Sequence, residues 1–189
     1  MAVSYFGLCD SSGNPTQSSS DSATGPASEW NNNTYLTFTC PGSGTQNILE
    51  LSAMVHVGSG SPNIRLAVYS SDYSTLIAQG TSEVVASGAS DSWQGHMTAA
   101  SVGNATLTGG TVYILVVSFD SGNLNTDHAH ADTSYGYYNV TDFTGGYSGS
   151  LTYVGSYKCW PCRCGVEAAG GPAAVTGSFI TLNRTWSSE

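Results

Sequence analysis

The chain has few charged residues, and cations are the scarcest of them. Only 4 Lys and Arg residues stand against 13 Asp and Glu residues, charged residues make up 9% of the 189, and the formal net charge is -9. Proteins that bind nucleic acid present rows of basic side chains to the phosphates, and anionic membranes attract similar clusters. The composition therefore argues against both partners and predicts a surface that interacts through hydrogen bonds.

Long hydrophobic runs are lacking as well. No stretch of about 18 apolar residues occurs, so no membrane-spanning helix is expected. The N-terminus has neither the basic nor the apolar region of a secretory signal, although a Ser-, Thr- and Gly-rich acidic chain is typical of proteins that work outside cells. A virion protein, made in a host cytoplasm and released by lysis, reconciles these properties. We expect a location on the virion surface, with an extracellular location as the alternative.

Motifs of catalysis are also missing from the sequence. No Gly-x-Ser-x-Gly elbow, His-Glu-x-x-His pair or phosphate-binding loop occurs, and Glu50, Glu83 and Glu167 lie in unrelated contexts. His56 and His96 fall in strand-like runs, where a histidine on the polar face is more often structural. We therefore expect a protein that is not an enzyme and that needs no cofactor.

The sequence is rich in short alternating segments separated by Gly-rich turns. Residues 111–119 are apolar on both faces, which indicates a central strand. Residues 48–57 alternate, which predicts one buried face formed by Leu49, Leu51, Ala53, Val55 and Val57. Further strands are expected at 34–39, 64–69, 76–78, 134–140, 150–156 and 176–184.

These segments predict an all-β fold, a two-sheet antiparallel β-sandwich over residues 34–189. Jelly-roll connectivity is favoured, and an immunoglobulin-like strand order is the next alternative. Residues 1–33 are rich in Ser, Gly and Asn and lack regular alternation, so they are expected to form an extended N-terminal arm. The apolar patch at Tyr5 and Phe6 suggests that this arm docks on its own or a neighbouring subunit.

Part of the sequence has a family resemblance. The segments 64–69, 76–80 and 107–115, together with Trp93, resemble jelly-roll sandwich modules of phage virion accessory proteins (decoration, fibre or tail) and of extracellular carbohydrate-binding proteins. The likeness covers about residues 35–120 and implies the same sandwich fold. In such modules the matching tryptophan and tyrosine pack internally, so the resemblance implies no binding site at Trp93 or Tyr113.

The number of cysteines is odd, at five, and three of them are clustered: Cys159, Cys162 and Cys164. They fit a zinc site completed by Cys9, Cys40 or a histidine, but a disulfide pattern, including a bond between subunits, fits equally well, and reduced thiols are a third alternative. A redox motif is disfavoured because no βαβ setting for a low-pKa thiol is apparent.

A second candidate metal site lies in the segment 127–132. His128 and His130 fall on one side of an extended chain, which is a usable spacing for metal ligands. The motif is short and isolated, so a solvated loop is the favoured interpretation.

Aromatic residues provide the main binding signal, because tyrosine and tryptophan serve both as sugar platforms and as protein-interface anchors. They concentrate in the last third of the chain, where some are also expected to pack in the core. The candidates for interface or glycan contacts are Tyr5, Phe6, Tyr137, Tyr147 and Trp160.

Together these features predict a non-catalytic structural or assembly protein. The leading hypothesis is a virion surface component, such as a capsid decoration, head-fibre or tail accessory protein, that forms homo-oligomers and contacts other virion proteins. The alternative hypothesis is a carbohydrate-binding module of an extracellular protein.

Overall fold

The computed structural model describes residues 3–16, 23–26, 32–81, 83–86, 88, 90–98, 102–121, 123–126, 136–139, 146–147, 150, 153–156 and 161–168. Every regular element within these ranges is a β-strand, and all of the strand pairings are antiparallel, which confirms the all-β prediction. Over the same residues, no helix is long and apolar enough to cross a membrane.

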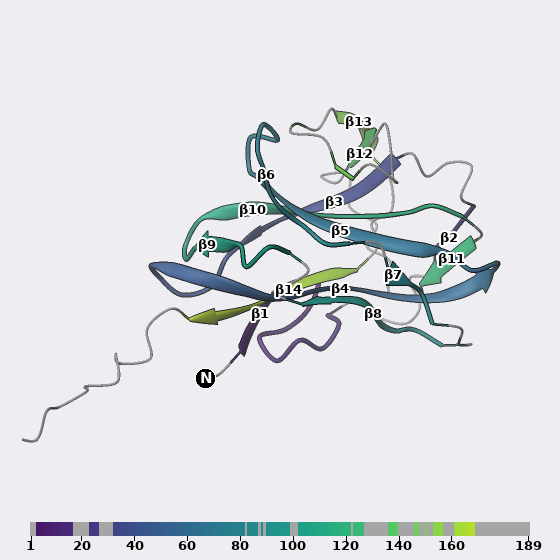
Figure 1. Cartoon of the computed structure of the whole chain (residues 1–189), viewed down its shortest axis with the longest axis horizontal. Helices are drawn as coiled ribbons and strands as arrows, with labels where there is room; N and C mark the ends of the chain where they lie inside the picture. Colours follow the sequence, from purple (N-terminus) through teal and green to yellow (C-terminus); the bar gives the residue numbers. More distant parts are fainter. Residues whose placement is uncertain are drawn as a thin grey trace, which may run out of the picture.

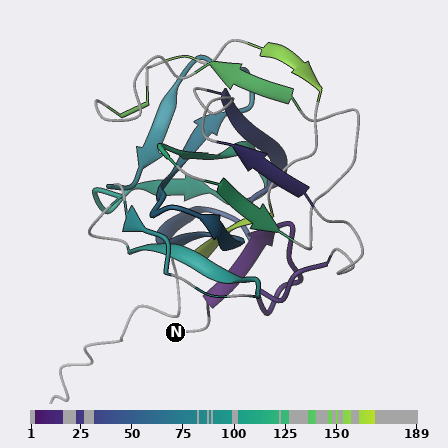
Figure 2. The same ribbon diagram turned by 90° about the vertical axis from the view of Figure 1, so that its right-hand side faces the viewer.

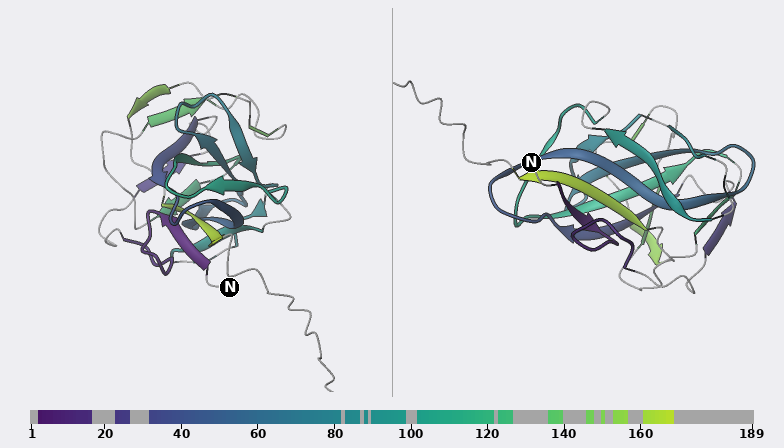
Figure 3. Two further views of the ribbon diagram at one scale, coloured as in Figure 1. Left: turned by 90° about the vertical axis from the view of Figure 1, so that its left-hand side faces the viewer. Right: turned by 90° about the horizontal axis from the view of Figure 1, so that it is seen from below.

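One sheet is organised around a single long strand. It contains β1 (Val3–Gly7), β2 (Ala23–Pro26), β4 (Thr45–Ser59), β8 (Ser92–Thr98), β9 (Thr106–Thr108), β11 (Asn123–Thr126) and β14 (Cys162–Ala168). The order is β1-β14-β4-β11-β2, and β8 and β9 also pair with β4. Figure 3 (right) shows β1, β14 and β4 lying next to one another in this sheet.

The other sheet is built around β10 (Val112–Phe119), which pairs with β3 on one side and β5 on the other. Its remaining strands are β3 (Asn32–Thr39), β5 (Asn63–Ser70), β6 (Leu76–Gln79), β7 (Glu83–Val84), β12 (Gly136–Asn139) and β13 (Tyr153–Ser156). The order is β13-β12-β3-β10-β5-β6, with β7 also paired to β5. The expected central position of residues 111–119 is therefore confirmed.

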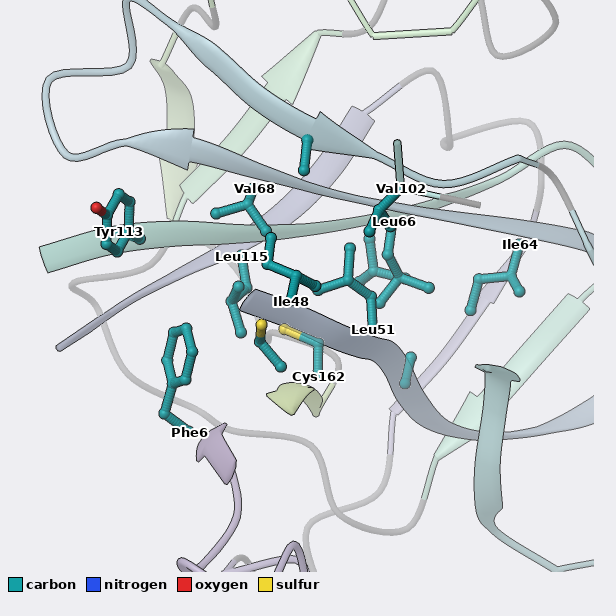
Figure 4. Close-up of a cluster of buried hydrophobic side chains, with 14 of the residues drawn as sticks. Phe6, Ile48, Leu51, Ile64, Leu66, Val68, Val102, Tyr113, Leu115 and Cys162 are labelled. Atoms are coloured by element: carbon teal, nitrogen blue, oxygen red, sulfur yellow. The ribbon is translucent and has the colours of Figure 1, made fainter. Parts of the chain in front are cut away.

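The two sheets form the two layers of a sandwich-like structure (Figures 1 and 2). Alternate side chains of β4, β5, β10 and β14 meet between the layers, as expected for strands with one face on a shared core. Figure 4 shows this core, in which Leu115 and Val68 of one sheet face Ile48, Leu51 and Cys162 of the other. Most of these side chains have almost no solvent exposure.

The register of β4 corrects one part of the sequence prediction. Leu51, Ala53 and Val55 belong to the core as expected, but Ile48 takes the place predicted for Leu49, which is only half-buried. The pairing with β14 explains the change, because Gly165 pairs with Glu50 and the next residue, Val166, pairs with Ile48. The extra residue forms a bulge, which reverses the side-chain alternation.

Part of the segment predicted as an N-terminal arm lies within the sandwich of its own chain. β1 pairs with β14, and β2 pairs with β11. The side chains of Phe6 and Leu8 are buried in the core. The predicted strand at 176–184 lies outside the described residues.

Candidate functional site

A cluster of side chains around Arg163 lies on the outer face of the sheet that contains β4. Its members are Tyr5, Glu50, Ser52, Trp93 and Arg163, and it is called the Arg163 cluster below. The guanidinium carbon lies 4.5 Å from the ring centroid of Tyr5 and 4.2 Å from that of Trp93, so the cation contacts an aromatic ring from each of two strands. Such contacts add electrostatic attraction to the packing of the rings.

Polar contacts fix the same guanidinium in its plane. Nε donates to Glu50 Oε1 and to Ser52 Oγ, both at 3.0 Å, and Nη2 donates to Glu50 Oε1 at 2.6 Å. Nη1 donates to the backbone oxygen of Gly13 at 2.6 Å. A guanidinium has five N–H groups, so one N–H on each terminal nitrogen has no acceptor among the described residues.

Strand register explains why these side chains meet. Arg163 of β14 pairs with Ser52 of β4, and Gly165 pairs with both Tyr5 and Glu50. The Tyr5 ring lies over Gly165, where a Cβ atom would come within 2.9 Å of the ring. The absence of a side chain at Gly165 therefore lets Tyr5 reach the guanidinium.

A short hairpin after β1 delivers the Gly13 oxygen to Arg163. The Asp10 carboxylate accepts hydrogen bonds from the backbone N–H groups of Ser12 and Asn14, both at 2.9 Å. These bonds, with the Asn14 contacts the strongest, hold the pKa of Asp10 below its usual range. An isolated antiparallel β-bridge between the backbones of Cys9 and Pro15 closes the hairpin. Residues 3–16 are thus fixed to the sheet by both a strand ladder and the Arg163 cluster.

A second polar cluster joins β4 and β11 to the start of β8. His56 Nδ1 lies 2.6 Å from Asp91 Oδ1, and Thr126 Oγ1 donates to Asp91 Oδ2 at 2.9 Å. The side chains of His56 and Asp91 are 13% and 3% exposed. The expectation that His56 has a structural role fits these contacts, because the buried carboxylate has partners on two strands.

The described cysteines lie mainly in the interior. Cys162 and Cys164 project from β14 into the core, Cys40 is buried at the end of β3, and Cys9 is half-buried. Loss of solvation on burial raises the pKa of both Cys9 and Cys40 to about 11, and it raises the pKa of Cys164 well above its usual value. Thiols in this state are poor nucleophiles at neutral pH.

The metal-site predictions rest partly on residues without a described placement. Cys159, His128 and His130 lie outside the described residues, so both metal sites stay predictions. Within the described ranges, no group of three or more His, Cys, Asp or Glu side chains is arranged to hold a metal ion.

The aromatic candidates have different positions. Tyr5 belongs to the Arg163 cluster and Phe6 to the core. The backbone of Tyr137 lies in β12 opposite Thr34, and Trp160 lies outside the described residues.

Tyr147 is buried against the outer face of the sheet that is built around β10. Its hydroxyl group donates to the backbone oxygen of Arg65 and accepts from Ser118 Oγ, both at 2.8 Å. Its ring meets that of Tyr69 edge-on, with the centroids 6.2 Å apart. Burial raises the pKa of Tyr147 far above its usual range. The residue therefore packs within its own chain.

Sequence reasoning missed Trp93 and Asp91 as members of polar clusters. Trp93 was expected to pack internally, but it lies on the outer face against Arg163, 70 positions along the chain. Asp91 is 35 positions from both His56 and Thr126. No local motif links such residues, and only the strand pairing brings them together.

Comparison with family models, curated proteins and solved structures gave no match for this chain.

Proposed function

We propose that this chain is a non-catalytic structural protein that acts through protein–protein contacts, as a repeating subunit on the surface of a virion. The observation that carries this proposal is that the Arg163–Glu50 ion pair is used within the chain. Arg163, one of only 4 fixed cations, is neutralised by Glu50 of its own chain and holds a terminal segment in place. A sandwich with few charged residues remains for contacts with partners.

Such a surface suits repeated assembly. Gly, Ser, Thr and Asn side chains are small or neutral, so neighbouring subunits approach closely without burying unpaired charges. A decoration, fibre or tail accessory protein meets many identical copies, and symmetric contacts of this kind multiply small interaction energies. The proposed roles are therefore capsid decoration, head fibre or tail accessory protein.

The proposal includes jelly-roll connectivity for the sandwich. In support, the chain passes repeatedly from one sheet to the other: β3, β5, β10 and β12 belong to one sheet, and β4, β8, β11 and β14 to the other. In jelly rolls, consecutive strands often belong to different sheets, whereas in up-and-down folds consecutive strands are neighbours in one sheet.

Co-expression of two differently tagged full-length copies tests the assembly role. Purification through the first tag should retain the second copy in a fixed ratio at physiological salt, because the contacts are not ionic and are screened little. Recovery of the first copy alone, with no second copy retained at any salt concentration, would contradict the proposal.

A further inference from the structure

The first described strand is paired with the last one. β1 pairs with β14 along its whole length, from Val3 to Gly7, and it stands at the end of the strand order. β14 lies between β1 on one side and β4 on the other. Removal of β1 would therefore expose one edge of β14, and an exposed edge is a template for another strand. It would break no other described ladder.

Residues 3–16 form a unit with few connections to the rest of the chain. Among the described residues, their hydrogen bonds lie either within the unit, where they close the hairpin, or between the unit and β14. The N–H group of Leu8 donates to the backbone oxygen of Cys162 at 3.0 Å, and the Gly13 oxygen accepts from Arg163 at 2.6 Å. The place that receives this unit is therefore defined chiefly by β14.

The contacts of the unit with the sandwich are of the kind found inside a protein. The side chains of Phe6 and Leu8 are 6% and 5% exposed and belong to the core between the sheets. The large apolar side chains that are exposed among the described residues lie in three different strands and are Val3, Val84 and Val112. A copy that donated the unit to its neighbour would join it through core packing and a strand ladder.

The connection between the unit and β2 is long enough for such a donation. Residues 17–22 have the sequence Gln-Ser-Ser-Ser-Asp-Ser, and a chain that runs from Thr16 to Ala23 spans at most about 25 Å. Neighbouring strands are about 4.8 Å apart and stacked sheets about 10 Å apart, so this reach extends to the sheet of an adjacent copy.

We propose that residues 3–16 of one copy occupy the place beside β14 of a second copy. This exchange rests on the proposed assembly role and specifies the contact through which the copies join. The donated unit makes the same ladder, core packing and Arg163 contact in either copy, so exchange leaves no buried group without its partner. Within an assembly, the neighbouring places are present at a high effective concentration, which favours exchange.

Cysteine cross-linking between two co-expressed copies tests the exchange. Val3 lies directly opposite Glu167 in the ladder. The N–H group of Tyr5 donates to the Ser11 oxygen and so points away from β14, which makes the pair two residues along a pair without mutual hydrogen bonds. The Cα atoms of such a pair are about 4.5 Å apart, a distance that a disulfide bridges.

One full-length copy carries Val3→Cys and the other carries Glu167→Cys, with different C-terminal tags and oxidised glutathione as the oxidant. Exchange predicts a covalent heterodimer in which a disulfide joins positions 3 and 167, identified by mass spectrometry of non-reduced peptides. A single copy that carries both substitutions should form the same bond and shows that the two positions can be bridged.

Two controls separate exchange from chance contact between surfaces. Val112→Cys replaces Val3→Cys in the first control, because Val112 has the same exposed fraction of 40% but pairs with Thr39. Its yield of heterodimer should be lower by about 10-fold or more. Gly7→Ala, added to the copy with Val3→Cys, should also lower the yield, because a Cβ atom there would lie 2.2 Å from the Cys162 oxygen and keep β1 away from β14.

The proposal is overturned if the co-expressed copies form no more heterodimer than the Val112→Cys control, or if Gly7→Ala leaves the yield unchanged. It is also overturned if the copy with both substitutions forms no bond between positions 3 and 167. If the second tagged copy is still retained in these cases, the assembly role stands without exchange. If it is not retained, both proposals fail, so the two failures are distinguishable.

Discussion

At the scale of residues, Arg163 connects segments that are distant in sequence. Its guanidinium contacts β1 through Tyr5, β8 through Trp93 and β4 through Glu50, and it reaches the hairpin through the Gly13 oxygen. The side chains of Arg163 and Glu50 are 11% and 23% exposed, so each is largely withdrawn from water. Loss of one partner would leave the other charged group poorly solvated.

Arg163→Met should therefore lower the free energy of unfolding by roughly 2–4 kcal/mol, because it removes the cation that neutralises the Glu50 carboxylate and the N–H group that donates to the Gly13 oxygen. Arg163→Lys keeps the charge but loses the planar fork, so it should fall between Arg163→Met and the wild type. Urea unfolding followed by circular dichroism measures both. A loss below about 0.5 kcal/mol for Arg163→Met would show that the cluster does not fix the N-terminal segment.

Gly7 provides a backbone test of the same docking. A Cβ atom at Gly7 would lie 2.2 Å from the backbone oxygen of Cys162, and its φ of 135° is unfavourable for other residues. Gly7→Ala should cost about 2 kcal/mol or more, because β1 must move away from β14. The control is Gly88→Ala, where the nearest atom is 3.9 Å away. Equal urea midpoints for the two variants would contradict the pairing of β1 with β14.

At the scale of elements, Tyr147 packs against β5 and β10. It joins Tyr69, Ile114 and Val116 in a small cluster on the side of the sheet opposite the main core. Its hydroxyl group bonds to Ser118 of β10 and to the backbone of Arg65 in β5. This cluster adds packing to the outer face of the two central strands.

Tyr147→Phe should lower the free energy of unfolding by about 1–2 kcal/mol at pH 7, since the ring stays but the hydroxyl bonds are lost. In the unfolded chain a tyrosine ionises near pH 10, and burial raises the pKa of Tyr147 above this value in the folded chain. The folded state therefore holds the proton more tightly. This contribution to stability is complete below about pH 10 and is lost as the pH rises further.

The difference between the wild type and Tyr147→Phe should consequently shrink above about pH 10, as measured by urea unfolding across a pH series. Ser118→Ala is the matched control, because it removes a hydrogen-bond partner and keeps the buried phenol. It should retain the alkaline loss of stability. A constant difference between wild type and Tyr147→Phe up to pH 11 would contradict the buried, protonated state.

The sequence predicted the elements better than their contacts. Alternation placed β4 and β10 correctly, because a strand with a buried face carries its pattern in its own residues. The bulge near Leu49 was not predictable, since it depends on pairing with Gly165 and Val166 far along the chain. Trp93 and Asp91 were missed for the same reason.

At the scale of the whole molecule, the described residues form two stacked sheets whose outer faces are stabilised by different means. Arg163 holds a terminal segment on one outer face, and Tyr147 packs on the other. A sandwich stabilised on both faces loses little conformational freedom when it joins an assembly, so modest contacts suffice to hold many copies together. The proposed role as a repeating surface subunit uses this rigidity.

Sedimentation velocity of the full-length wild-type chain over a concentration series tests that role most directly. The account predicts species heavier than the 19.5 kDa monomer, whose fraction grows with concentration and does not fall when salt is raised, because the contacting surfaces carry few charges and salt screens the repulsion between copies of net charge -9. A single 19.5 kDa species at every concentration up to about 1 mM would contradict it.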